Sequence, residues 1–270
     1  MDKKVIILIP ARKNSKRLPN KNMKQLCGHP LIHYQIETAL KVKNIDDIYV
    51  NTDDENIITY CQEKYKDKIK IYQRKEELAT DHTTMLEVVL DFVDNIDCDY
   101  LILLQPTSPL LDSKYIEEGL DRLNLDKDLE PEYHPDYVRV KHYQDTCISV
   151  SEERGFYWDR EENRNERERT QDMKPQIKEN GSFYILRASE VKKNKQFFNF
   201  PVGFIYMPKK ESFEIDTEED FEIVEAMMEH NKRKKEKEHG KKAKSLLDEI
   251  FGTNGYFLPD DSDNNGGFGY

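Results

Sequence analysis

Cysteine is scarce and scattered in this chain, which limits what could hold the fold together. The 270 residues include four cysteines, namely Cys27, Cys61, Cys98 and Cys147. They form no C-x-x-C pair, so the sequence predicts neither a structural zinc site nor a disulfide framework. We expect four unbridged thiols in a reducing compartment.

Long apolar runs are missing as well. The apolar run at residues 5–10 is too short for a signal peptide, and no stretch approaches the roughly 20 apolar residues that span a bilayer. Acidic residues outnumber basic ones by 53 to 42, and the formal net charge of −11 argues against general affinity for nucleic acid. We therefore expect a cytoplasmic protein whose partners include neither a membrane nor a nucleic acid.

Apolar and polar segments alternate in a βα rhythm over the first 123 residues. The pattern predicts strands at 5–9, 47–50, 69–72 and 100–104, and helices at 30–40, 55–65, 85–93 and 113–123. This order predicts an α/β fold with a Rossmann-like, doubly wound and mostly parallel sheet. Ligands bind such sheets at the carboxyl ends of the strands, where a polar loop follows each predicted strand. These loops are 12–22, 52–53, 74–84 and 105–109.

The rhythm breaks after residue 124. Residues 124–143 are acidic, contain two prolines and are expected to form an insertion or exposed loop. Further strands are predicted at 146–150, 181–186 and 204–207, and a final helix at 218–235. Residues 238–270 are first charged and then rich in Gly, Asn and Asp, which predicts a disordered tail behind a single domain at 1–237.

The loop after the first strand is strongly basic and lacks glycine. It carries Arg12, Lys13, Lys16, Arg17 and Lys21, and it matches neither the G-x-G-x-x-G nor the G-x-x-x-x-G-K-[ST] phosphate loop. A loop without closely packing glycines must hold phosphates with side chains, and Arg and Lys do so through charge-assisted hydrogen bonds. A solvated basic loop is the alternative. Its place at the ligand edge of the sheet, in an acidic chain, favours phosphate binding.

Two carboxylates before the final helix form a second candidate site. Glu214 and Asp216 flank Ile215, so in an extended segment they point the same way while Ile215 faces the core. Such a pair beside a phosphate loop suits Mg²⁺, which accompanies triphosphates in nucleotidyl transfer. Thr217 and Asp220 also fit a competing role in capping the helix.

Four segments stand out by their residues, order and spacing. They are IPARKNSKRLPNKN (9–22), LLQPTSPL (103–110), RTQDMKPQIKENGSFYI (169–185) and EIDTEEDF (214–221). Together they resemble the acylneuraminate cytidylyltransferase family, the CMP-sialic acid synthetases, over about residues 4–230. The resemblance implies a fold of the nucleotide-diphospho-sugar transferase type, CTP as co-substrate and Mg²⁺ as cofactor. It also implies a homodimer, with a small dimerisation lobe at about 138–180.

The resemblance assigns roles to individual residues. It places nucleotide binding at Ala11, Arg12, Asn14, Ser15, Lys16, Lys21, Asn22, Arg74 and Thr84. It places sugar binding at Gln105, Thr107, Arg169, Gln171 and Lys178, and metal binding at Glu214 and Asp216. Ser108 joins the sugar-binding candidates because polar groups at the carboxyl end of a strand could contact a sugar. The implied reaction transfers CMP from CTP to the anomeric hydroxyl of a nine-carbon ulosonic acid of the N-acylneuraminate, legionaminate or pseudaminate type, and releases pyrophosphate. Arg12, Lys21 and Asp216 are the expected catalytic residues.

Three departures from the family pattern keep alternatives open. Glu214 stands where the family has D-x-D, Leu111 stands where it reads SPLR, and residues 150–169 are short and highly charged. One alternative is a degenerate CTP-binding or scaffold protein without turnover. Another is a sugar-1-phosphate nucleotidyltransferase, although that class commonly has a glycine-rich first loop. The S-K-x-x-P-x-K-N pattern argues against an eight-carbon ketodeoxyoctonate acceptor.

Overall fold

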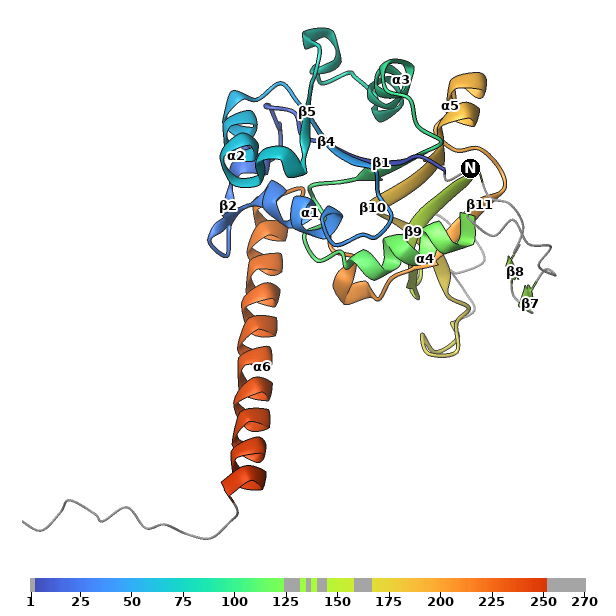
Figure 1. Ribbon diagram of the computed structural model, residues 1–270. Helices are drawn as coiled ribbons and strands as arrows, with labels where there is room; N and C mark the ends of the chain where they lie inside the picture. Colours follow the sequence, from blue (N-terminus) through green and yellow to red (C-terminus); the bar gives the residue numbers. More distant parts are fainter. Residues whose placement is uncertain (1–2, 124–131, 135–136, 140–144, 158–166, 252–270) are drawn as a thin grey trace, which may run out of the picture. The chain divides into compact units, whose positions relative to one another are not determined.

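A seven-stranded sheet is the centre of the first of two units, Met1–Glu225, in the computed structural model of the chain (Figure 1). The structure describes residues 3–123, 132–134, 137–139, 145–157 and 167–251. The strands of the sheet are β1 (Val5–Pro10), β4 (Asp47–Thr52), β5 (Lys70–Gln73), β6 (Tyr100–Leu104), β9 (Thr146–Glu153), β10 (Gln176–Arg187) and β11 (Val202–Tyr206). A separate hairpin consists of β2 (Gln25–Leu26) and β3 (His29–Pro30).

The order of the strands confirms the predicted doubly wound, mostly parallel sheet. The order across the sheet is β11-β9-β10-β6-β1-β4-β5. Strand β1 pairs in parallel with β4 on one side and β6 on the other, while β10 pairs antiparallel with both of its neighbours. The chain therefore runs outward from β1 to β5 and then returns to the other side of β1 as β6.

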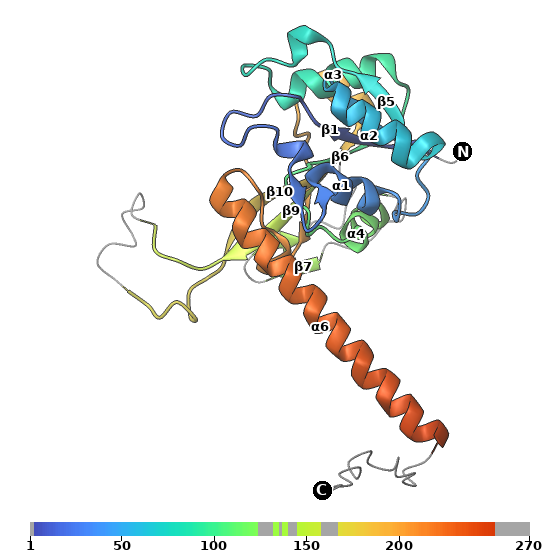
Figure 2. The same cartoon turned by 90° about the vertical axis from the view of Figure 1, so that its left-hand side faces the viewer.

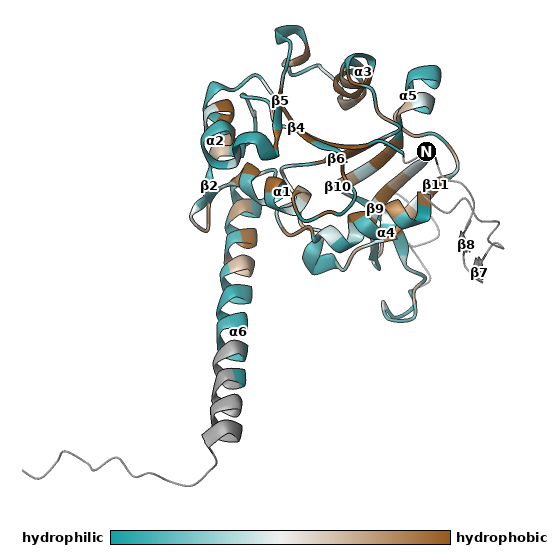
Figure 3. Cartoon of the chain, viewed as in Figure 1, coloured by the Kyte–Doolittle hydropathy of each residue, from teal (hydrophilic) through white to brown (hydrophobic). Residues whose placement is uncertain are grey.

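Helices cover both faces of the sheet because its central strands are apolar on both. The helices are α1 (Leu31–Ala39), α2 (Glu55–Tyr65), α3 (Met85–Asn95), α4 (Ser113–Leu123), α5 (Ala188–Asn194) and α6 (Glu218–Phe251). Ile7 and Ile9 of β1 share a buried cluster with residues of α1, α2 and α4. Ile6 and Leu8 point to the other face and pack with residues of α3 and α5. The strands accordingly form the apolar centre seen in Figure 3.

Local sequence signals explain why three of the predicted helices begin where they do. The Asp54 side chain accepts a hydrogen bond from the Asn56 N–H at 2.9 Å and caps α2. Thr84 and Glu87 form a reciprocal capping box at the start of α3. Pro30 immediately precedes α1, where its fixed φ suits the entry into a helix.

Two parts of the chain differ from the prediction. The segment expected as an insertion or exposed loop contains an antiparallel ladder of β7 (Glu132–His134) and β8 (Tyr137–Arg139). Helix α6 continues well past residue 235, and it passes through the division between the first unit and the second, Ala226–Tyr270. The part of the expected disordered tail from 252 onward lies outside the described residues, as do parts of the expected dimerisation lobe.

Two further observations concern bonding and membranes. No disulfide joins the four cysteines, all of which lie within the described residues, and Cys61, Cys98 and Cys147 are buried. Among the helices in the described part of the chain, none is long and apolar enough to cross a membrane.

The strand order reverses between β1 and β6, and a ligand site can form at the carboxyl ends of these two strands. The chain leaves these neighbouring strands in opposite directions across the sheet, because the next strand of the sheet after β1 is β4 on one side, while the next after β6 is β9 on the other. A crevice at such a topological switch point is where open α/β sheets bind ligands. Figure 2 shows the long loop after β1 from the side.

Candidate functional site

A cavity of about 510 Å³ lies at the switch point between β1 and β6. The loops after β1, β5 and β6 line it, together with the segment before α6. Ten of the predicted site residues are among its lining residues, namely Arg12, Ser15, Lys16, Lys21, Asn22, Arg74, Thr84, Gln105, Thr107 and Asp216. Most of the predicted nucleotide site is therefore gathered in one place.

The basic loop that forms one wall of this cavity is anchored at both of its ends. The Ala11 N–H donates to the Asn51 carbonyl at 2.9 Å, which ties the start of the loop to β4. The buried Asn22 donates through Nδ2 to the Arg12 carbonyl at 3.1 Å and closes the loop on itself. Asn22 thus fixes the shape of the loop, and four of its five cationic side chains, those of Arg12, Lys16, Arg17 and Lys21, line the cavity.

Asp81 pairs with two cations of the basic loop. Arg12 Nη1 lies 2.8 Å from Asp81 Oδ1, and Lys16 Nζ lies 3.0 Å from Asp81 Oδ2. All three residues line the cavity, and Asp81 belongs to the loop between β5 and α3. Asp81 was not among the predicted site residues, because nothing near it in the chain signals a partner 69 residues away.

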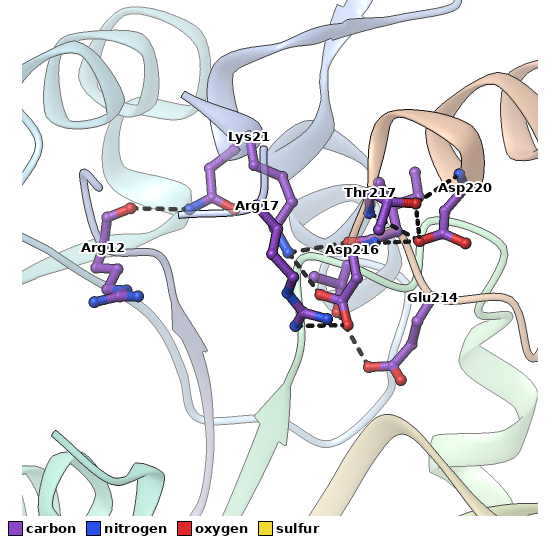
Figure 4. A network of polar contacts seen from close by, with 10 residues as sticks. Arg12, Arg17, Lys21, Glu214, Asp216, Thr217 and Asp220 are labelled. Atoms are coloured by element: carbon purple, nitrogen blue, oxygen red, sulfur yellow. Dashed lines mark hydrogen bonds and ion pairs between the residues drawn. The ribbon is translucent and has the colours of Figure 1, made fainter. Parts of the chain in front are cut away.

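Arg17 and Lys21 pair with the second acid, Asp216 (Figure 4). Arg17 Nη2 and Lys21 Nζ lie 2.9 and 3.1 Å from its two carboxylate oxygens. Lys21 Nζ also donates to the Ile215 carbonyl at 3.0 Å, and only 12% of the Lys21 side chain is exposed. Lys21 is therefore held firmly in the cavity wall, whereas Arg17, a member of the predicted basic loop to which the resemblance assigned no role, lines the cavity with a side chain that is 67% exposed.

Arg74 places a further cation at the cavity, and this one is buried. It donates to Asn51 through Nε to Oδ1 at 2.5 Å and through Nη2 to the carbonyl at 3.4 Å. Burial lowers the pKa of Arg74 to about 10, and the nearby positive charge of Arg12 also lowers it. The Asp53 carboxylate opposes this lowering, and Arg74, whose hydrogen bonds go to the neutral Asn51, stays charged at neutral pH and available to an anion.

Glu214 and Asp216 carry their carboxylates side by side, as Figure 4 shows, and Ile215 between them is fully buried, as predicted. The Ile215 N–H donates to the Thr107 carbonyl at 2.8 Å, so this segment runs beside the loop after β6. Thr107 Oγ1 also lies 3.4 Å from Glu214 Oε1. Burial raises the pKa of Glu214, and the charge of Asp216 raises it further. Arg17 and Lys21 pair with Asp216, and the charge of Lys21 opposes the upward shift of the Glu214 pKa.

The residues present fit a magnesium ion. Mg²⁺ is usually held by one or two carboxylates, with phosphates and waters completing its ligands. Glu214 and Asp216 supply two such carboxylates at the edge of the cavity. Within the described residues, no group of three or more His, Cys, Asp or Glu side chains is arranged to hold a metal, so the remaining ligands would have to come from substrate and water.

Asp220 has the capping role and lies beside this pair. Its carboxylate accepts from the N–H groups of Asp216 and Thr217 at 3.0 and 2.8 Å. The Asp220 N–H donates in turn to Thr217 Oγ1 at 3.2 Å. These bonds fix the start of α6 and with it the position of Asp216.

A second cavity of about 340 Å³ shares Asp216 with the first. Its other lining residues include Lys178 and Glu214 from the predicted site, together with Glu153 and the buried Asn180. Lys178 Nζ lies 3.3 Å from Glu153 Oε1. Because Asp216 lines both cavities, the cavities adjoin, and ligands bound in them would lie next to each other.

Five predicted site residues line neither cavity. They are Ala11, Asn14, Ser108, Arg169 and Gln171. Ala11 and Ser108 are buried, and the Ser108 carbonyl accepts a hydrogen bond from Gln35 in the helix layer. Arg169 is exposed and pairs with Asp172 at 2.7 Å.

The departure at Leu111 is accommodated by the core. Leu111 is 4% exposed and belongs to the cluster under α1 and α4. Its carbonyl accepts from Thr38 Oγ1 at 3.1 Å, and its N–H donates to the Ser108 carbonyl at 3.2 Å. These bonds anchor the end of the loop after β6 without an arginine.

Comparison with known proteins shows which family and which proteins this chain resembles in sequence. The chain matches the family model described as cytidylyltransferase over residues 6–243. It is 33% identical over 228 residues to the N-acylneuraminate cytidylyltransferase of Streptococcus agalactiae serotype V, in a match that covers 81% of this chain and 52% of the relative. The chain thus spans about half the length of the streptococcal relatives it matches.

Other proteins match over nearly their whole length. The CMP-N,N'-diacetyllegionaminic acid synthase of Legionella pneumophila is 30% identical over 240 residues, covering 84% of this chain and 97% of the relative. The pseudaminic acid cytidylyltransferase of Campylobacter jejuni is 26% identical over 241 residues, with the same coverage. Among solved structures, a CMP:2-keto-3-deoxy-manno-octonic acid synthetase complexed with CTP has a TM-score of 0.63 at 17% identity, covering 84% of this chain and 99% of that one, and shares the fold.

Proposed function

The chain belongs to the cytidylyltransferase family, and on that premise we propose that it transfers CMP from CTP to the anomeric hydroxyl of a nine-carbon ulosonic acid. Pyrophosphate is the second product. The observation that carries the proposal is the pair of neighbouring cavities that share Asp216, the first lined by five cationic side chains and the second by carboxylates, two lysines and neutral polar groups. The names of the relatives suggest an acceptor of the N-acylneuraminate, legionaminate or pseudaminate type.

The cation-lined cavity would take the triphosphate of CTP. Arg12, Lys16, Lys21 and Arg74 place four cationic groups around it. Nucleotidyl transfer breaks the bond between the α-phosphorus and the pyrophosphate as the acceptor oxygen forms its own bond to that phosphorus. Fixed positive charges stabilise the negative charge that develops on the phosphate oxygens during this exchange. Lys21 is the best placed for this, because it is the most tightly held cation of the basic loop.

Glu214 and Asp216 would hold a magnesium ion, and the ion supplies charge neutralisation to a bound triphosphate. Asp216 is itself fixed by Lys21, Arg17 and the cap of α6, so one of the two carboxylates that would hold the ion has a defined position.

Gly181 has no side chain, and this leaves space for the Glu214 carboxylate. Its φ is +66°, and a Cβ at this position would overlap the Glu214 carboxylate, with Cδ only 2.8 Å away. Gly181→Ala is expected to lower the free energy of unfolding by about 1–2 kcal/mol, the cost of a left-handed backbone for a residue with a Cβ. It should also lower kcat, because the Glu214 carboxylate must move. Thermal unfolding and steady-state kinetics of the variant measure both effects.

Glu214→Asp provides the matched background for this variant. A shorter side chain withdraws from position 181, so Gly181→Ala should cost less kcat when Glu214 is already aspartate. The strain of the backbone remains in either background, so the loss of stability should persist. Equal losses of kcat in both backgrounds would show that Gly181 does not position Glu214.

The second cavity would take the sugar acid. Lys209 and Lys178, the latter paired with Glu153, bring positive charge for the acceptor's carboxylate, while Asn180 offers hydrogen-bonding groups for its hydroxyls. The proposal further includes a cytoplasmic location and a homodimer in which residues 138–180 form the contact lobe. Light scattering coupled to size exclusion measures the dimer directly.

The proposed activity is tested by pyrophosphate release. The protein is incubated with Mg²⁺, a nine-carbon acid and CTP, with ATP, GTP and UTP as controls. Release that requires CTP, the acid and Mg²⁺ together supports the proposal. Binding of CTP without release, over the whole panel of acids, would favour a degenerate nucleotide-binding protein instead.

A further inference from the structure

Asp81 stands across the cavity from the basic loop and contacts two of its cations. Asp81 Oδ1 lies 2.8 Å from Arg12 Nη1, and Oδ2 lies 3.0 Å from Lys16 Nζ. Both of its carboxylate oxygens are thus engaged, one by each cation. Lys16 and Arg12 lower the pKa of the Asp81 carboxyl, so it is charged at neutral pH.

The loop that carries Asp81 is tied to the basic loop at more than one point. Arg12 Nη1 also donates to the Thr80 carbonyl at 3.0 Å. Thr80 and Thr83 share a hydroxyl–hydroxyl hydrogen bond of 2.8 Å, and Thr84 begins α3 in its capping box. Asp81 is therefore presented to Arg12 by a short, internally bonded loop.

A carboxylate and a triphosphate would compete for the same donors. Arg12 and Lys16 line the cavity together with Asp81, so an anion that used them would come to lie beside the Asp81 carboxylate. Like charges at such short range repel, so an anion that took the N–H groups that Arg12 and Lys16 give to Asp81 would weaken or break these two ion pairs.

We propose that Asp81 is an intramolecular anion that occupies Arg12 and Lys16 until the polyphosphate of the substrate displaces it. The proposal rests on the proposed function only in naming a nucleoside triphosphate as the natural competitor. The carboxylate keeps the two cations gathered at the cavity in the free protein. The carboxylate also lowers the affinity for any polyphosphate, because its ion pairs with Arg12 and Lys16 must be weakened or broken when the polyphosphate binds. Asp81 therefore influences both substrate binding and product release.

The test measures binding of inorganic tripolyphosphate by titration calorimetry, without CTP, sugar acid or turnover. Asp81→Asn should bind tripolyphosphate about three- to tenfold more tightly than the natural chain at an ionic strength of about 0.05 M, as expected for loss of partly exposed competing ion pairs. The gain should shrink at about 0.5 M salt, where exposed charges are screened. Asp81→Glu keeps the carboxylate and should bind as the natural chain does.

Asp47→Asn is the control for net charge. Asp47 pairs with Lys70 at 2.6 Å at the start of β4, the end of the strand opposite the cavity, so its removal should leave binding unchanged. Equal or weaker binding by Asp81→Asn would overturn the proposal, as would the same gain in Asp47→Asn or no binding of tripolyphosphate to the natural chain. This binding measurement does not depend on CMP transfer. The Asp81 proposal can therefore hold even if the protein makes no CMP-sugar, and it can fail even if the protein does make one.

Discussion

Asp216→Ala is expected to lower kcat/KM for CTP by at least about a hundredfold, which corresponds to about 2.7 kcal/mol of transition-state stabilisation. Asp216 lines both cavities, pairs with Lys21 and Arg17, and would hold the magnesium ion together with Glu214. The substitution removes one of two carboxylates for the metal and leaves the enclosed Lys21 with only the Ile215 carbonyl of its two acceptors. Steady-state kinetics over a range of Mg²⁺ concentrations measure the loss.

Glu218→Ala is the matched control for Asp216→Ala. It removes the same charge two residues away, from a side chain that pairs with Lys24 outside both cavities and is 59% exposed. Its kinetics should stay within about twofold of the natural chain, as expected for a surface ion pair. An Asp216→Ala protein that is folded and retains Mg²⁺-dependent turnover would remove Asp216 from the metal site.

Lys21→Ala is expected to lower kcat/KM at least about tenfold, or about 1.4 kcal/mol of transition-state stabilisation. Lys21 Nζ is fixed by Asp216 and the Ile215 carbonyl, so its charge is in place before substrate binds. A preorganised charge contributes more than a mobile one, because no reorganisation is needed when charge develops on the phosphate. The measurement is kcat and KM for CTP at saturating acid.

Lys24→Ala separates this effect from a general loss of positive charge. Lys24 pairs with Glu218 and lies 4.4 Å above the centre of the Phe221 ring, and it does not line either cavity. Its kinetics should be close to those of the natural chain. If Lys21→Ala and Lys24→Ala have equal kinetics, Lys21 has no place in the mechanism.

The core of the fold could be predicted from the sequence because its strands are buried on both faces. Residues 5–9 and 100–104 are continuous apolar runs, and the structure has β1 and β6 there. The direction of β10 could not be predicted, since nothing in residues 176–187 records which way a strand runs in the sheet. Helix α6 was predicted too short, because a Lys/Glu-rich stretch is typical of both exposed helix and disordered tail.

The site could be predicted only where its members lie together in the chain. The basic loop and the Glu214–Asp216 pair are local patterns, and the structure brings them to one cavity through Lys21 and Asp216. Asp81 was missed because its partners come from a different strand end. Ser108 was included because polar groups at the carboxyl end of a strand suggest a sugar site, yet this loop turns inward and buries it. Burial of this kind depends on packing of the helices, which a single loop sequence does not record.

The most direct test of the central claim identifies the product. The chain is incubated with CTP, Mg²⁺ and, in separate reactions, N-acetylneuraminic, legionaminic, pseudaminic and ketodeoxyoctonic acids, and the products are followed by ³¹P NMR. Equal amounts of pyrophosphate and of a CMP phosphodiester of one nine-carbon acid are expected. A CMP phosphodiester of the eight-carbon acid alone, or intact CTP in all four reactions despite measurable CTP binding, would contradict the central claim.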